Sequence, residues 1–412
     1  DCEPVAMISE REFIDSMERA SSEVGGLRLA IATDIESGGG IFNYEDFLAS
    51  GNSSALERAV GAGDDAGIVY TSGTTSLPKG AVLTHGNYLA DHANVGTFAE
   101  LDATSVNLQM SPLYHASCIH TFMHVTYGGR TVLMGKFEPG PALKLLQDEK
   151  ITYAFMVPTM IYAWLDFPDL ANYDIGALRT IDYGAAPMSE VRLHEALRTF
   201  GYIFIHAYGM TETSSHASLL GKMEQTIAPG SVGRGLIHSE IRIVDNNGAP
   251  CAPGEIGEIV IRGPHVMSRY WRRPEATAET LVDGWLHSGD LGRTDANGYV
   301  YVVDRKRDMI ISGGVNLYPR DIEEVIAAHP GVGEVAVFGI PDEKWGESIA
   351  ACIVLRKGAT ATADDIVRFA GERIARFKIP KLIEFVSELP KNPSGKVLKR
   401  VLQDRHKTAM AV

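Results

Sequence analysis

Cysteines are few in this sequence, and their spacing is not that of a metal site or a disulfide framework. Cys2, Cys118, Cys251 and Cys352 are scattered along 412 residues without a CxxC or CxxH pair. The spacing therefore indicates neither a zinc finger nor a small disulfide-linked fold. Reduced thiols are usual in the cytoplasm, so we expect a cytoplasmic protein.

The sequence also lacks an apolar signal segment and an excess of positive charge. Charged residues occur throughout the start of the chain, where a signal peptide would have an apolar core. The apolar run Ile151–Leu165 is short and has Pro158 in its middle, which predicts a buried strand leading into a helix and not a transmembrane segment. The net charge of −14 argues against nucleic acid as the main partner.

The order of apolar and helix-like segments predicts an α/β fold with two domains. Between Ile68 and Gly209, apolar runs alternate with helix-like segments, which is the pattern of a parallel sheet covered by helices. From Ser231 the sequence changes to short strands with turns such as Asn-Asn-Gly, and after a charge cluster it alternates helix and strand again. We therefore expect a large domain at 1–304 with a β subdomain at about 231–304, a hinge at 305–307, and a small α+β domain at 308–412.

A loop rich in hydroxyl groups, TSGTTSLPKG at 71–80, follows one of the strand-like runs. Its glycines allow backbone angles that side chains forbid, and its hydroxyl groups can donate to oxygen anions. Lys79 adds a positive charge, so the composition suits a phosphate. The loop is not a Walker A motif, because Pro78 and Gly80 flank Lys79 and no hydroxyl residue follows the lysine. From composition alone, a solvated linker without a ligand stays open.

Two later polar stretches also have residue types suited to a nucleotide. HAYGMTET offers Tyr208 as a stacking surface, and Thr211 and Glu212 as hard oxygen ligands for Mg²⁺ beside phosphates. The alternative is a helix N-terminus with Thr211 and Glu212 in its first turn. HSGDLG centres on Asp290, whose carboxylate can accept from sugar hydroxyls, although an ordinary Gly-Asp turn would explain the stretch as well.

Two basic residues complete the candidate set. Arg305 can donate hydrogen bonds close to where Asp290 accepts them, or be a solvated charge. Lys396 follows Gly395 in KNPSGK near the C-terminus. An exposed surface lysine without a function is the ordinary interpretation at such a position. Each residue taken alone leaves both readings open.

Taken in order, these stretches resemble the motifs of the adenylate-forming superfamily, which comprises acyl-CoA synthetases, adenylation domains and firefly-type luciferases. YTSGTTSLPKG resembles its phosphate loop, and GAAP and HAYGMTET resemble its adenine and magnesium motifs. HSGD and DRKRD resemble its ribose and hinge motifs, and PKNPSGKVLKR resembles its terminal lysine motif. The resemblance covers about Asp64 to Arg400, which is nearly the whole chain.

The resemblance implies a two-step reaction with ATP, Mg²⁺, CoA and a small carboxylic acid. The carboxylate attacks the α-phosphate of ATP to give an acyl-adenylate and pyrophosphate, and the thiol of CoA then displaces AMP. Catalytic roles fall to Lys396, which would bridge carboxylate and phosphate oxygens, and to Thr211 and Glu212, with Mg²⁺ near Glu212. The implied nucleotide-binding residues are Thr71, Ser72, Gly73, Thr74, Thr75 and Lys79 for the phosphates, Asp290 and Arg305 for the ribose, and Gly184, Ala185, Ala186, Tyr208 and Gly209 for the adenine.

The resemblance also implies a mobile C-terminal domain that rotates about the hinge at Arg307 between the two steps. The rotation would move Lys396 out of the active site and bring in the loop SGGVNLYP. Gly313 and Gly314 match positions where the family's backbone approaches CoA, which is a use for residues without side chains. A plain β-turn is the alternative for these two glycines.

Three departures from the family's pattern bear on activity. Ser76 stands where the family usually has glycine, and Ile311 stands where luciferases carry a lysine, which disfavours a luciferase. Members of the family carry a longer lead-in before the phosphate loop. We therefore expect an N-terminal part of the large domain to be absent from this chain.

The substrate is expected to be a fatty or aryl carboxylic acid. The implied acyl pocket lies near PLYHAS and HAYG, where His115 and His206 would flank it, although a lone histidine among apolar neighbours is more often part of the core. The segment 155–165 carries large apolar residues and no obvious charged partner for the amino group of an amino-acid substrate. An amino acid is therefore less expected as the substrate than a fatty or aryl acid. We therefore predict an acyl-CoA ligase, with an enzyme that loads a carrier protein and a remnant without activity as alternatives.

Overall fold

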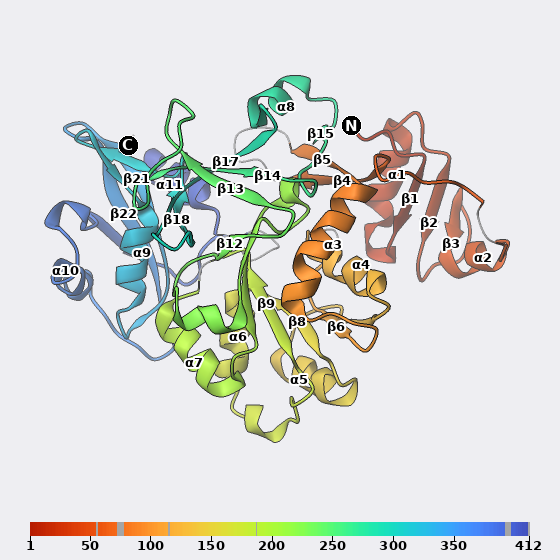
Figure 1. The fold of residues 1–412 in the computed structure, drawn as a ribbon, viewed down its shortest axis with the longest axis horizontal. Coiled ribbons are helices and arrows are strands. Elements are labelled where there is room, and N and C mark those ends of the chain that lie inside the picture. Colours follow the sequence, from red (N-terminus) through yellow and green to blue (C-terminus); the bar gives the residue numbers. More distant parts are fainter. Residues whose placement is uncertain (55–56, 72–77, 114–115, 187, 392–396, 411–412) are drawn as a thin grey trace. The chain divides into compact units, whose positions relative to one another are not determined.

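The computed structural model describes all residues except 55–56, 72–77, 114–115, 187, 392–396 and 411–412 (Figure 1). The chain divides into two compact units, Asp1–Gly61 and Ala62–Val412. Among the helices of the described residues, none is both long and apolar enough to cross a membrane.

The first unit is a three-stranded parallel sheet with two helices. Met17 of α1 packs on Ala30 and Ala32 of β2 to make its small core. Asn43 begins α2 as its N-cap, because its side chain accepts from the backbone N–H groups of Glu45 and Asp46. The elements are β1 (Ala6–Ser9), α1 (Ile14–Glu23), β2 (Leu29–Ala32), β3 (Ile41–Asn43) and α2 (Tyr44–Ala49).

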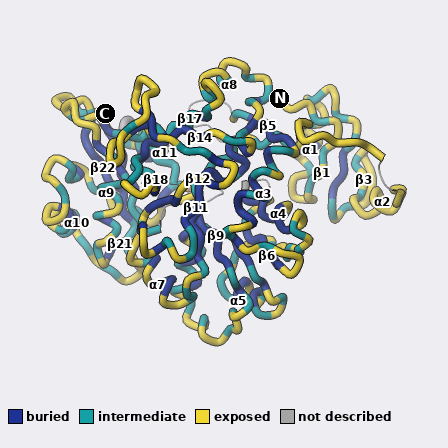
Figure 2. The backbone as a smooth tube through the Cα atoms, viewed as in Figure 1, coloured by how far each residue is buried: buried dark blue, intermediate teal, exposed yellow. Residues whose placement is uncertain are grey.

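The largest sheet of the second unit has seven strands in the order β12-β11-β10-β9-β8-β6-β7. The strands from β7 to β10 run parallel, and β11 and β12 extend the sheet antiparallel at one edge. Figure 2 shows that buried residues follow these strands. The strands are β6 (Val106–Gln109), β7 (Arg130–Leu133), β8 (Tyr153–Met156), β9 (Thr180–Gly184), β10 (Phe204–Tyr208), β11 (Ser218–Leu220) and β12 (Arg234–Gly235).

Helices cover both faces of this sheet, as the alternation of apolar segments predicts. On one face, Val95 of α3 and Met123 of α4 pack with Ile205 of the sheet. On the other face, Leu143 and Trp164 are among the residues that pack against the opposite side chains of the same strands. The helices are α3 (His85–Ala99) and α4 (Ile119–Thr126) on the first face, and α5 (Pro139–Asp148), α6 (Pro158–Leu165) and α7 (Glu190–Phe200) on the second.

The prediction for the apolar run Ile151–Leu165 is confirmed. Strand β8 occupies its first part, and α6 begins at Pro158. Proline is favourable in the first turn of a helix, because the N–H it lacks would have no partner there. Trp164 in α6 is fully buried, so the run forms part of the protein core.

The prediction that the parallel sheet begins at Ile68 is wrong. Strands β4 (Asp65–Thr71) and β5 (Lys79–Thr84) pair antiparallel, and with β15 (Arg269–Tyr270) they form a separate three-stranded sheet. The physical reason is the short connection between β4 and β5. Parallel neighbours need a crossover of roughly a dozen residues or more, whereas a short loop joins antiparallel strands.

The expected β subdomain is a five-stranded antiparallel sheet. Gly248 has a φ of +80° in the turn after β13, where the sequence has Asn-Asn-Gly. The elements are β13 (Glu240–Val244), β14 (Gly257–Arg262), α8 (Pro274–Thr280), β16 (Leu281–Val282), β17 (Trp285–Thr294) and β18 (Val300–Arg305).

The C-terminal part of the chain has α+β architecture: a five-stranded sheet with helices on both faces. In β22, Ile349, Ala351 and Ile353 pack with α9 and α10, while Ala350 and Cys352 face the other way and pack with α11. The elements are β19 (Ile310–Ser312), β20 (Val315–Leu317), α9 (Pro319–Ala327), β21 (Val332–Asp342), β22 (Gly346–Leu355), α10 (Ala363–Gly371), β23 (Leu382–Phe385) and α11 (Lys399–Met410).

Candidate functional site

Three of the predicted nucleotide-binding residues lie together. Asp290 of β17 stands opposite Arg305 of β18 in the antiparallel ladder, and Arg305 Nε lies 3.5 Å from Asp290 Oδ1. The hydroxyl of Tyr208, at the end of β10, donates to Asp290 Oδ2 at 2.9 Å. Burial raises the pKa of Tyr208, and the charge of Asp290 raises it further, so the phenol stays protonated. The two sheets thus place a ring, a carboxylate and a guanidinium in one site.

The predicted adenine segment lies beside Tyr208. Strand β9 ends at Gly184, which pairs with Ala207 of the parallel strand β10. A Cβ atom on Gly184 would be 2.6 Å from the carbonyl oxygen of Ala207, and one on Gly209 would be 2.0 Å from that of Ser215. Both positions therefore need glycine. Because the carboxyl ends of parallel strands meet at one edge, Gly184 to Ala186 adjoin Tyr208, as a ligand site at this edge requires.

Thr211 and Glu212 lie in a short 3-10 turn, Thr211–Thr213. Tyr270 of β15 donates its hydroxyl to Glu212 Oε1 at 2.6 Å, and Lys79 Nζ lies 4.6 Å from the centre of the Tyr270 ring. The pairing of β15 with β5 makes this possible, because Tyr270 stands opposite Ala81 in that ladder. One tyrosine therefore contacts both the lysine of the predicted phosphate loop and the predicted magnesium carboxylate.

Several predicted site residues lie outside the described residues. Thr71, at the end of β4, donates its hydroxyl to the carbonyl oxygen of Lys79 at 3.3 Å, which holds the two ends of the phosphate loop together. The residues for which the structure gives no description are Ser72, Gly73, Thr74, Thr75, His115 and Lys396. Their roles stay predictions.

His206 is buried in β10, two residues before Tyr208 of the predicted nucleotide site. Its ring stacks on Tyr183 with centroids 4.5 Å apart, and its Nδ1 lies 2.9 Å from the carbonyl oxygen of Ser231. Burial lowers its pKa to about 4, so the ring is neutral at pH 7. These are contacts of a histidine packed in the core, and its place in an acyl pocket stays a prediction.

The predicted CoA glycines form the turn of a hairpin. Gly313 and Gly314 join β19 to β20 with φ angles of +57° and +80°, which are those of a two-residue turn that favours glycine. A Cβ atom on Gly313 would lie 2.7 Å from the Trp345 ring. At the predicted hinge, Arg307 Nε lies 3.5 Å from Asp308 Oδ1. The turn is thus established, whereas the roles in CoA binding and rotation stay predictions.

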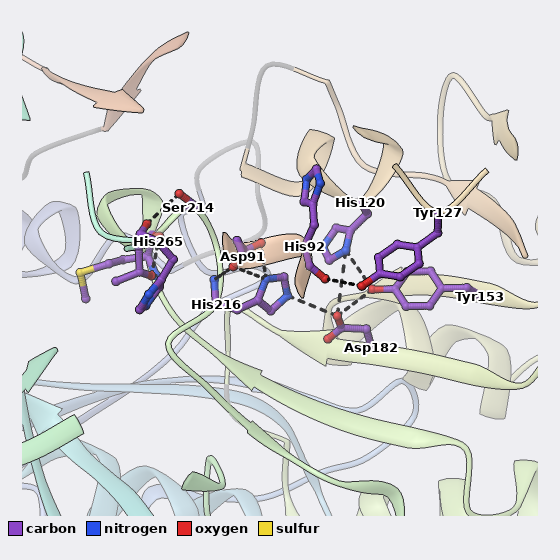
Figure 3. Close-up of polar contacts among 11 residues, drawn as sticks. Asp91, His92, His120, Tyr127, Tyr153, Asp182, Ser214, His216 and His265 are labelled. Atoms are coloured by element: carbon purple, nitrogen blue, oxygen red, sulfur yellow. Dashed lines mark hydrogen bonds and ion pairs between the residues drawn. The ribbon is translucent and has the colours of Figure 1, made fainter. Parts of the chain in front are cut away.

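The structure also contains a buried charged centre, which the sequence analysis missed. Figure 3 shows His216 between Asp91 and Asp182. His216 Nδ1 lies 3.2 Å from Asp91 Oδ2, and Nε2 lies 3.4 Å from Asp182 Oδ2. Tyr153 donates to Asp182 Oδ2 at 2.7 Å, and His120 Nδ1 lies 2.8 Å from the Tyr153 hydroxyl. Burial alone would lower the pKa of His216, but the two carboxylates outweigh it and raise the pKa to about 10.

The centre joins the elements that carry the predicted site segments. Asp91 lies on α3, which follows the phosphate-loop hairpin, and His120 lies on α4, which follows the PLYHAS stretch. Asp182 lies on β9 just before Gly184, and His216 follows Glu212 by four residues. The His216 backbone N–H also donates to Asp91 Oδ1 at 3.2 Å, so α3 holds the segment after Glu212 by two contacts.

Stability is expected to fall steeply in mild acid because of five other buried histidines. Burial lowers the pKa of His92, His124, His206 and His265 to about 4 and that of His120 to about 3. Below pH 6.5 the unfolded chain binds protons that the folded protein does not, and each such group removes about 1.4 kcal/mol per pH unit until the folded pKa is reached. Urea unfolding at pH 7.5, 6.5, 5.5 and 5.0 measures this loss.

His216 has the opposite effect on stability. Its folded pKa is raised, so its contribution is complete below pH 6.5 and is lost as the pH rises toward 10. The free energy of unfolding should therefore have its maximum near pH 6.5. A stability that is constant between pH 7.5 and pH 5.0 would contradict the neutral state of the five histidines.

Models of known families match both parts of the chain. Residues 1–271 match the model described as AMP-binding enzyme, and residues 321–396 match the AMP-binding enzyme C-terminal domain. The solved structure of ATP-bound MatB from Rhodopseudomonas palustris superposes with a TM-score of 0.89 at 32% sequence identity, and the match covers 99% of this chain and 80% of that chain.

Curated relatives are similar over most of the sequence. The feruloyl-CoA synthase of Amycolatopsis sp is 40% identical over 363 residues, which are 87% of this chain and 73% of that protein. The indoleacetate–CoA ligase of Aromatoleum aromaticum is 36% identical over 402 residues, which are 97% of this chain and 78% of that protein. With its site motifs, its fold and these similarities, the chain belongs to the family of AMP-binding enzymes, the adenylate-forming superfamily.

Proposed function

We propose that the protein is an AMP-forming carboxylate–CoA ligase that acts on a fatty or aryl carboxylic acid. The observation that carries the proposal is the grouping of Tyr208, Asp290 and Arg305 beside the Gly184–Ala186 segment, in a member of this family. A ring for stacking, a carboxylate for sugar hydroxyls and glycine backbone for close approach together suit the adenosine part of a nucleotide. The free cysteines agree with a reducing compartment, and we place the enzyme in the cytoplasm.

In the first step, a carboxylate oxygen of the acid forms a bond to the α-phosphorus of ATP while the bond to pyrophosphate breaks. The loop Thr71–Lys79 would hold the β- and γ-phosphates, and Lys396 would neutralise charge on the carboxylate and the α-phosphate. The oxygens of Thr211 and Glu212 are of the hard type that Mg²⁺ prefers, and Tyr270 fixes the Glu212 carboxylate through Oε1. Magnesium bound there would neutralise phosphate charge.

In the second step, the sulfur of CoA attacks the acyl carbonyl carbon, and the bond to AMP breaks. We assign the CoA approach to Gly313 and Gly314, whose hairpin turn presents backbone without side chains. The domain boundary at 305–307, with Arg307 as the hinge, would let the 308–412 domain exchange Lys396 for this turn. His115 and His206 are assigned to the acyl pocket.

Two of the relatives favour an aryl acid within the proposed class. The feruloyl-CoA synthase and the indoleacetate–CoA ligase both carry the name of an aryl acid substrate. We therefore rank aryl acids first in the test.

Pyrophosphate release by the purified chain with Mg-ATP tests the proposal. We expect release that depends on one class of acid in a panel of aryl, fatty and amino acids, and a thioester product only when CoA is present. Transfer to a phosphopantetheinyl protein in preference to CoA would select the carrier-loading alternative. A folded protein that releases no pyrophosphate with any acid would contradict ligase activity of this chain.

Replacing Asp290 with asparagine is expected to weaken ATP binding about tenfold to a hundredfold, because a hydrogen bond to a charged group contributes roughly 1.5–3 kcal/mol. Asparagine keeps the shape and can still accept from Tyr208, so the fold should survive. Calorimetric titration with ATP measures the change, and Asp283→Asn is the control, since Asp283 is exposed and the charge change is the same. Equal affinities in Asp290→Asn and the parent protein would contradict the ribose assignment.

A further inference from the structure

Three potential metal ligands converge in the C-terminal α+β part of the chain, and none of them is assigned to the reaction. Strands β22 and β23 pair in parallel, and Cys352 stands directly opposite Glu384 in their register. Side chains that are opposite each other lie on the same face of a sheet. Cys352 lies on the face that packs with α11, so Glu384 points to that face as well.

Helix α11 brings the third side chain over the same face. Leu402 of α11 packs in the core beside Cys352, and His406 follows it by one turn, with its ring 5.3 Å from that of Phe338. His406 Nε2 lies 3.0 Å from Glu384 Oε2, and Cys352 Sγ lies 3.7 Å from the same oxygen. The three ligand atoms lie within 4.8 Å of one another.

The orientation of the His406 ring is fixed by its other nitrogen. Nδ1 lies 2.7 Å from the carbonyl oxygen of Leu402 and can only donate there, which directs Nε2 at the Glu384 carboxylate. A backbone carbonyl that accepts from the far nitrogen is the usual support of a histidine that binds a metal. Two acceptors 3.0 Å apart need a cation between them, and either a proton or a metal ion can supply it.

We propose that Cys352, Glu384 and His406 form a zinc-binding site, with water as the fourth ligand. A thiolate, an imidazole and a carboxylate make a mixed donor set that suits Zn²⁺, and bonds of about 2.0–2.3 Å in a tetrahedron put neighbouring ligand atoms roughly 3.3–3.7 Å apart. Glu384 Oε2 lies 3.0 Å from His406 Nε2 and 3.7 Å from Cys352 Sγ, which is close to that geometry. The Glu384 side chain is half exposed, which gives the ion an entry path and leaves room for the water.

Zinc binding at this site competes with the proton on the Cys352 thiol. Burial, together with the charge of Glu384, raises the pKa of the Cys352 thiol to about 12, although the charge of Arg405 acts in the opposite direction. The thiol must lose its proton to bind zinc, so affinity should increase with pH. Bound zinc would fasten α11, the helix that follows the Lys396 segment, to β22 and β23.

The buried centre around His216 is a weaker candidate for a metal. His120, Asp182 and His216 also bring three ligand atoms within 4.8 Å. However, the pKa of His216 is raised to about 10, so a proton already holds the positive charge between the two carboxylates. All three side chains are fully buried, whereas Glu384 is open to solvent.

Cobalt titration of the full chain tests the zinc site, because Co²⁺ bound to a thiolate gives a near-ultraviolet charge-transfer band. We expect one equivalent of Co²⁺ to produce the band, and Zn²⁺ to abolish it by displacement. Cys352→Ser should remove the band, while Cys251→Ser, a change of the same kind at a half-buried cysteine in the β subdomain, should keep it. His406→Gln and Glu384→Gln should each weaken Zn²⁺ binding at least tenfold, measured by calorimetry.

Thermal unfolding in the presence of chelator shows whether each variant folds. Zn²⁺ should raise the melting temperature of the parent protein and of Cys251→Ser, but not that of Cys352→Ser. A band that persists in Cys352→Ser, zinc affinity that is equal in all variants, or the absence of a thiolate band in the folded parent protein would each overturn the proposal.

Discussion

Replacing His216 with glutamine is expected to lower the free energy of unfolding by about 3–5 kcal/mol, because it removes the positive charge that lies between two buried carboxylates. Asp91 and Asp182 would then lie buried without the positive charge that His216 supplies within the described structure. Urea unfolding at pH 7, followed by tryptophan fluorescence, measures the loss.

His194→Gln is the matched control, because it makes the same chemical change at a histidine that is exposed on α7. Its effect should be within about 0.5 kcal/mol. Adding Asp182→Asn to His216→Gln should recover part of the stability, since one of the two uncompensated charges is removed. A His216→Gln protein as stable as His194→Gln would show that the centre carries no net charge interaction.

Most of the secondary structure was predictable because its causes are local. The run at Ile151–Leu165 forms β8 and α6, since proline suits the first turn of a helix and interrupts a strand. The wrong strand was the one at Ile68. Apolar character alone does not distinguish a strand of the parallel sheet from one of a hairpin, and the short connection before Lys79 is what distinguishes them.

The candidate site was predictable where the chain carries a contiguous motif and not where it depends on distant pairs. HAYGMTET and HSGD indicate Tyr208 and Asp290, and the structure brings the two side chains within 2.9 Å. Tyr270 was missed because its contact with Glu212 joins residues 58 positions apart. His216 was missed for the same reason, since its partner Asp91 is 125 positions away and neither residue has a local signature.

Lys396→Ala is expected to reduce formation of the acyl-adenylate by about a hundredfold to a thousandfold, because it removes the positive charge that we propose neutralises oxygens that become more negative in the transition state. The prediction depends on the KNPSGK motif, since Lys396 lies outside the described residues. The second step should proceed almost unchanged when the acyl-adenylate is supplied, because the hinge is expected to remove Lys396 before CoA attacks. Pyrophosphate release measures the first step, and thioester formation from added acyl-adenylate measures the second.

Lys391→Ala distinguishes a specific role of Lys396 from a general effect of lost charge in this part of the chain. Lys391 lies five residues earlier, and its Nζ pairs with Glu334 Oε2 at 2.7 Å near the surface. Such a pair contributes little to stability, so both steps should continue at close to the parent rate. If Lys396→Ala slowed both steps equally, the lysine would act on substrate binding or folding, and the proposed rotation of the C-terminal domain between the steps would lose its main support.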